Sequence, residues 1–115
     1  MHELSIALSI VDRITEEADS RGGLEIEAVH LRVGKLSGVD TEALAFSYQI
    51  ACQGTFLERS RLIIETVSLL MRCPQCGREH SPSSTQELFC PRCITPAQEV
   101  IRGKEIELTA LELAA

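Results

Sequence analysis

The sequence predicts an α+β fold in which two helices pack on a three-stranded mixed sheet and a zinc-ribbon-like module with four cysteines is inserted before the last strand. Three observations predict this class. Two segments show helical spacing of apolar residues, and three short segments alternate or are rich in β-branched residues. Residues 71–99 hold two cysteine pairs and all four prolines. The chain of 115 residues is long enough for one principal core.

The two helices are predicted from the spacing of their apolar residues and from their end signals. The first covers residues 4–21, and its apolar positions recur at intervals of three and four: Leu4, Ala7, Leu8, Val11, Ile14 and Ala18. Gly22 and Gly23 are expected to end it. The second is expected to start at Asp40 or Thr41 and to close at Gly54. Its apolar stripe is Leu44, Ala45, Tyr48, Ala51 and Cys52.

The predicted strands cover residues 24–33, 62–70 and 104–113. In the first, the apolar positions change parity at Ala28 and Val29, which indicates either a bulge or a strand covered on both faces. The last strand alternates apolar and polar residues, so it needs a sheet that the short cysteine segment cannot offer. We therefore expect an αβ domain formed by residues 1–70 and 100–115. The four-cysteine module (residues 71–99) is expected at the far end of an antiparallel hairpin of the second and third strands.

Charge and composition exclude several classes of protein. Eleven Lys and Arg residues against seventeen Asp and Glu give a net charge of −6, which disfavours binding to a nucleic-acid backbone. Three Phe, one Tyr and no Trp leave few platforms for base stacking. The apolar runs are too short to span a bilayer, and the first residues lack the basic region of a signal peptide. We expect a cytoplasmic protein that binds neither nucleic acid nor membranes.

The two cysteine pairs are the strongest functional signal. Cys73 and Cys76 form one C-x-x-C pair, Cys90 and Cys93 form another, and thirteen residues separate the pairs. Such pairs bring four thiolates to one tetrahedral metal. Paired redox motifs are disfavoured because neither pair follows a βαβ unit. Zinc is favoured over a rubredoxin-type iron because the segment has a single aromatic residue. Four cysteines leave no open coordination position, so the predicted zinc is structural.

Five other residues have predicted structural roles. Gly77 is expected to take a positive φ while its amide donates to a sulfur. Ile94 occupies the corresponding position after the second pair, where a glycine is expected, so either a strained or a differently shaped turn is predicted there. Cys52 is expected to be a small apolar residue of the helix core, and His30 a hydrogen-bonded histidine of a strand. His80 is expected to lie at the surface or beside the metal centre.

The chain begins Met1-His2-Glu3, which is a candidate site for nickel. The Met1 amine, the His2 amide nitrogen and the His2 imidazole can form fused five- and six-membered chelate rings, and Glu3 can add its amide or its carboxylate. Nitrogen-rich sets of this kind suit Ni(II) and Cu(II). The residues alone leave open the alternative that His2 and Glu3 form a frayed, solvated helix start.

The chain resembles the HypA/HybF family of hydrogenase-maturation nickel chaperones. The resemblance rests on the Met-His-Glu-Leu-Ser start, the αβαβ body, the paired CPxC motifs and the closing Gly-Lys-Glu-Ile-Glu-Leu strand. Residues 33–39, 44–46 and 103–107 also resemble that family's characteristic segments. Ile94 departs from the family, which usually has glycine after the last cysteine.

This resemblance implies a non-enzymatic metallochaperone. Nickel as cargo would be bound by Met1, His2 and Glu3, and structural zinc by the four paired cysteines, Cys73, Cys76, Cys90 and Cys93. The implied role is delivery of Ni(II) to the large-subunit precursor of a [NiFe]-hydrogenase, with a nickel-loading GTPase as partner. Urease maturation proteins are partners of some relatives. A P-loop reading of Gly34-Lys35 fails because Val29 stands in place of the first glycine and Leu36 in place of Ser or Thr, so any nucleotide step lies in another protein. The main alternative is a zinc-ribbon adaptor that acts only through protein contacts.

Overall fold

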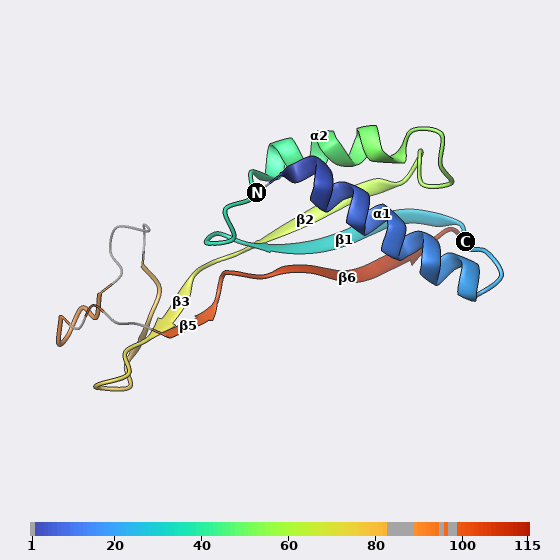
Figure 1. Ribbon diagram of the computed structural model, residues 1–115. Helices are drawn as coiled ribbons and strands as arrows, with labels where there is room; N and C mark the ends of the chain where they lie inside the picture. Colours follow the sequence, from blue (N-terminus) through green and yellow to red (C-terminus); the bar gives the residue numbers. More distant parts are fainter. Residues whose placement is uncertain (1, 83–88, 95, 97–98) are drawn as a thin grey trace.

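The computed structural model describes residues 2–82, 89–94, 96 and 99–115. The chain first alternates helices and strands and then forms a second group of short strands before it returns to the first (Figure 1). In chain order the elements are α1 (Glu3–Ser20), β1 (Ile26–Gly34), α2 (Thr41–Cys52), β2 (Arg61–Val67), β3 (Leu70–Arg72), β4 (Glu79–His80), β5 (Glu99–Arg102) and β6 (Ile106–Leu113).

The main sheet has the order β2-β1-β6. β1 pairs in parallel with β2 and antiparallel with β6, so the sheet is mixed as predicted. The helix α2 connects the two parallel strands, and both helices cover the same face of the sheet (Figure 1). The predicted hairpin of the second and third strands is wrong. β2 and β6 do run in opposite directions, but β1 separates them, because alternation shows which face of a strand is buried and not which strand lies beside it.

The parity change in the first strand comes from a bulge. Ile26 pairs with Leu113 and Ala28 with Glu112, so Glu27 is an extra residue in β1. A second irregularity places Thr109 as an extra residue in β6. The bulge predicted at Ala28 and Val29 therefore exists, one residue earlier in the chain. Beyond it, one face of β1 points towards the helices and the other towards solvent.

The core lies between the helices and the sheet, and it is built from the stripes that the sequence pattern indicates. Each large aliphatic side chain buried there contributes roughly 1.5–3 kcal/mol to folding. The fully buried members are Ala7, Ile14, Val29, Leu31, Val33, Leu44, Tyr48, Cys52 and Leu57. The apolar stripe predicted for the first helix includes two residues that are not buried and omits one that is. Leu4 and Leu8 are 43% and 46% exposed, and Ile10 is buried instead.

The two helices begin close to one another. Asp40 caps α2, as predicted, because its Oδ1 accepts hydrogen bonds from the amides of Glu42 and Ala43. The amide of Asp40 lies 3.5 Å from Oε2 of Glu3, at the start of α1. This contact fixes the first residues of the chain beside the start of α2, at the end of the domain nearest the cysteines (Figure 1).

A second, smaller sheet with the order β4-β3-β5 supports the cysteines. The predicted strand of residues 62–70 is interrupted at Ser68 and Leu69, so that β2 and β3 belong to different sheets. β3 is antiparallel to both neighbours and pairs with β5 from Leu70 to Arg72. The chain therefore leaves the main sheet through one strand and returns beside it through another.

The loop after β1 joins the two sheets. The amide of Lys35 donates to Val67 on the outgoing segment, and the amide of Leu36 donates to Gly103 on the returning segment. Gly34 packs directly on Gly103, since a Cβ on Gly34 would lie 2.1 Å from the Gly103 carbonyl oxygen. These contacts hold both connecting segments at one point, which we call the Gly34–Gly103 junction.

Candidate metal centres

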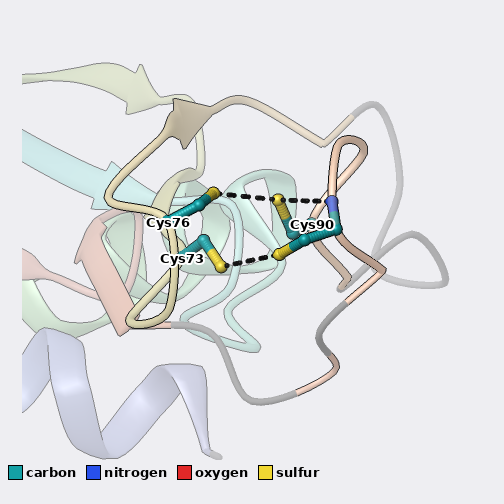
Figure 2. A group of neighbouring side chains, drawn as sticks. Cys73, Cys76 and Cys90 are labelled. Carbon is teal, nitrogen blue, oxygen red and sulfur yellow. Dashed lines mark hydrogen bonds between the residues drawn. The ribbon is translucent and has the colours of Figure 1, made fainter.

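The four paired cysteines converge on one point. Their sulfur atoms all lie within 4.8 Å of one another. The Sγ atoms of Cys73 and Cys93 are 3.4 Å apart, and those of Cys76 and Cys90 are 3.6 Å apart (Figure 2). In a zinc tetrahedron with Zn–S bonds of about 2.3 Å, neighbouring sulfurs lie about 3.8 Å apart. The sulfur arrangement therefore fits a structural four-thiolate zinc ion.

The sulfur atoms influence one another's ionisation. Burial raises the pKa of the Cys73 thiol, but hydrogen bonds from the amides of Cys76 and Gln75 outweigh burial and lower that pKa to about 6. The Arg78 amide lowers the pKa of Cys76, but desolvation and the neighbouring sulfurs raise it to about 11. Four adjacent sulfurs cannot all become thiolates at neutral pH without a cation among them. A divalent metal bound among the sulfurs would supply that cation.

The two cysteine turns have the same backbone geometry. The amide of Gly77 donates to the Cys73 carbonyl at 2.8 Å, and the amide of Ile94 donates to the Cys90 carbonyl at 2.9 Å. The prediction that the Gly77 amide donates to a sulfur is wrong, because the closing bond of the turn takes that amide. The Cys90 sulfur accepts instead from amides inside its own turn, at 3.4 Å.

Ile94 adopts the left-handed conformation that its place in the turn requires. Its φ is +56°, against +76° for Gly77, and it is the only non-glycine residue with positive φ in the described chain. A β-branched side chain is strained there, and the Ile94 side chain is 73% exposed, so packing offers little compensation. Of the two alternatives predicted for the second turn, the structure shows the strained one, with the same shape as the first turn.

We expect Ile94→Gly to stabilise the zinc-loaded four-cysteine module by about 1 kcal/mol, because glycine takes positive φ without a steric penalty. The measurement is zinc retention against a competing chelator, which should rise about fivefold. Gly77→Ile is the matched control, since the space around Gly77 is open and the change adds only backbone strain. It should weaken zinc retention. Equal retention in all three proteins would contradict this account.

Two residues outside the cluster, Cys52 and His30, have the structural roles predicted for them. Cys52 is 2% exposed and lies in the main core, where burial raises the pKa of its thiol. His30 lies 2.9 Å from the Glu112 carboxylate across the open face of the sheet. His80 lies in β4, and neither ring nitrogen has a hydrogen-bond partner among the described residues.

The candidate nickel residues are only partly described. Met1 lies outside the described residues. His2 is exposed and directly precedes α1, with an extended backbone and no side-chain capping bond. Its imidazole therefore does not cap the helix. Glu3 accepts the hydrogen bond from the Asp40 amide, a contact between residues 37 positions apart that no local sequence pattern indicates.

Residues 1–113 match the family model described as hydrogenase/urease nickel incorporation, metallochaperone, hypA. The chain belongs to the HypA family. This family is one of metallochaperones and not of catalysts, and its model covers the Met-His-Glu start and both cysteine pairs.

Individual relatives match over nearly the full length. The hydrogenase maturation factor HypA of Chloroflexus aurantiacus is 46% identical over 112 residues, which cover 97% of this chain and 98% of the relative. That of Thermomicrobium roseum is 36% identical over 128 residues, with 98% of each chain covered.

Solved structures show the same fold. The solution structure of the Ni metallochaperone HypA from Helicobacter pylori superposes with a TM-score of 0.72 at 22% identity and covers 100% of this chain and 99% of that one. Another solution structure of a HypA protein gives a TM-score of 0.74, also at 22% identity. Within the part of the chain that the structure describes, no helix is both long and apolar enough to cross a membrane.

Proposed function

We propose that this HypA-family protein binds Ni(II) at its N-terminus and delivers it to the large-subunit precursor of a [NiFe]-hydrogenase. The ligands are the Met1 amine together with His2 and Glu3. The family match carries the proposal, because it covers residues 1–113 and is named for nickel incorporation. The exposed position of His2 supports it, since among the described residues the imidazole makes no capping hydrogen bond at the helix start. A nickel-loading GTPase is the expected partner, and urease maturation proteins are further candidates.

We also propose that Cys73, Cys76, Cys90 and Cys93 hold a structural zinc ion. The distances between the sulfurs support this ligand set. Zinc would supply the positive charge that lets all four thiols ionise, and it would link the two cysteine turns. The backbone amides of each cysteine turn donate hydrogen bonds to the sulfurs and so orient them. Nickel, the cargo, needs exposed ligands that can release it.

Nickel binding is expected to need both the His2 side chain and a free chain end. His2→Ala removes the imidazole, and an N-terminal extension of a few residues converts the terminal amine into an amide. Each should weaken nickel binding at least about tenfold, or about 1.4 kcal/mol, by calorimetry on the zinc-loaded protein. Binding should also weaken as pH falls from about 8 to 6, because amine and imidazole must lose protons to bind metal.

A C-terminal tag of the same length as the extension is the control, because it leaves every proposed ligand intact. It should leave nickel affinity unchanged, and zinc content should be equal in all variants. If the N-terminally extended protein binds nickel as tightly as the native one, the terminal amine is not a ligand. A native protein that holds zinc and no nickel would favour the zinc-ribbon adaptor instead.

A further inference from the structure

The main sheet has an incompletely covered edge at β6. Within the described residues no strand pairs with the outer side of β6, which borders the sheet (Figure 1). The apolar side chains that β6 turns towards the helices, Ile106, Leu108 and Leu111, are only partly buried. A helix-covered sheet normally buries this row. The β6 edge is therefore open, with a partly exposed apolar row beside it, within the described part of the chain.

A groove runs between α1 and β6. Its main cavity has a volume of about 530 Å³ and starts at His2. Ser5, Ser9 and Arg13 form the wall on α1, and Leu31, Ile106 and Leu108 line the strand side. A second cavity shares Arg13 and Leu108 with the first, so the groove continues along the strand. The groove thus connects the proposed nickel ligand to the open edge of the sheet.

The backbone of β6 is free to pair with another strand. The Glu105 carbonyl accepts from Gly34 of β1, and the Ala114 amide donates to Glu25 just before β1. Because successive peptide groups of a strand point to opposite sides, the neighbouring amides of Ile106 and Leu113 point away from β1. An extended chain segment can therefore add to this edge by main-chain hydrogen bonds.

The charges on β6 indicate which kind of strand can pair with its edge. β6 carries two acidic residues, Glu107 and Glu112, and no basic one. Both lie on the open face of the sheet, beside Arg32 and His30. Arg32 instead pairs with Glu65, and Glu107 has no ion pair among the described residues. A second copy of β6 would align acid beside acid, which is unfavourable, whereas a strand with basic residues on this face would pair with them.

We propose that the β6 edge and the groove beside it form a docking site for an extended segment of a nickel-exchanging partner protein. The segment alternates apolar residues, which enter the groove, with Lys or Arg, which lie against Glu107 and Glu112. A carboxylate at the groove-facing position nearest Arg13 completes the pattern, since Arg13 has no ion pair within the described chain. The nickel exchange in this proposal rests on the proposed function; the docking of the segment does not.

The test uses an acetylated and amidated peptide, Lys-Val-Lys-Val-Lys-Glu-Lys-Val-Lys, with zinc-loaded, nickel-free protein. Its charge-reversed twin exchanges every Lys and Glu. The first peptide should bind by fluorescence anisotropy and slow the hydrogen exchange of the Ile106 and Leu113 amides, and the twin should bind at least tenfold more weakly. Because nickel is omitted, failure of the nickel site would leave this result unchanged.

Two pairs of variants locate the site. Glu107→Lys should weaken binding of the first peptide about fivefold, because an attractive cross-strand pair becomes repulsive. Glu58→Lys, an exposed change near β2, is its control and should leave that binding within about twofold. Ser9→Tyr should block the groove, and Ser20→Tyr, at the far end of the same helix, should not. Equal binding of the two peptides, unchanged exchange of the β6 amides, or a free protein that is a dimer dissociated by Glu107→Lys would each overturn the proposal.

Discussion

Gly34→Ala is expected to lower the free energy of unfolding of the zinc-loaded protein by about 3 kcal/mol, the upper end of what overpacking costs. The added Cβ would lie 2.1 Å from the Gly103 carbonyl oxygen and 2.7 Å from the Lys104 nitrogen. Both atoms belong to backbone, so no side-chain rotation relieves the clash. The change has to push β1 away from the segment that returns from the four-cysteine module.

The loss would affect several hydrogen bonds together. The amide of Gly34 donates to Glu105, and the next two amides donate to Val67 and Gly103. Fitting a methyl group requires Gly34 to move by about an ångström, which lengthens the bonds on both connecting segments. The Gly34–Gly103 junction thus sets how the two sheets are held together, and a methyl group is enough to disturb it.

Urea unfolding followed by circular dichroism measures this effect. Gly38→Ala is the matched control, because that glycine has a φ of +79° and open space around it. Its replacement adds backbone strain of about 1 kcal/mol and no clash. A loss of less than about 1 kcal/mol in Gly34→Ala would show that the junction tolerates displacement and that the close approach is not needed.

The sequence predicted the elements well because their periodicities report directly on burial. In α1 and α2 the buried positions recur at three and four residues, since one face of each helix meets the sheet. The cap at Asp40 was predictable because it needs only the side chain and the next two amides. The strain at Ile94 was predictable because the two cysteine turns share one local geometry.

Strand order and the groove were not predictable in this way. Nothing in the alternation of β6 shows that β1, and not β2, is its neighbour, because the choice depends on how α2 crosses the sheet. The groove is assembled from residues as distant as His2 and Leu108, and no local pattern marks them. No local pattern shows why Gly34 lacks a side chain, because the reason is its contact with the distant Gly103 backbone. Gly103 itself has a φ of +111°, and a Cβ there would lie 2.7 Å from the Leu69 Cα.

Removal of zinc is expected to unfold the four-cysteine module while the αβ domain keeps its structure. Among the described residues of the module, Met71 is the only buried apolar side chain apart from Cys73 and Cys90. One side chain cannot offset the ordering entropy of the segment, which is about 1–2 kcal/mol per residue for the backbone alone. Structural zinc sites contribute roughly 10–16 kcal/mol of apparent binding energy, enough to fold such a segment. The main core between helices and sheet contains none of the four ligands.

Hydrogen exchange before and after chelation checks this expectation. Amides of β3 and β5 should lose protection, while those of Val11, Ile26 and Leu31 keep it. Uniform loss across the chain would show that residues 71–99 and the αβ domain form one cooperative unit.

Two cysteine variants separate zinc loss from general damage. Cys90→Ala removes a fully buried proposed ligand, so bound zinc should fall from one equivalent to near zero, with the same local pattern of exchange. Cys52→Ala is the matched control, because it removes a buried thiol in the main core, away from the cluster. It should lower the stability of the αβ domain by about 1 kcal/mol through the small cavity it leaves, and retain the full zinc equivalent. Loss of zinc in Cys52→Ala, or its retention in Cys90→Ala, would show that the ligand set is wrong.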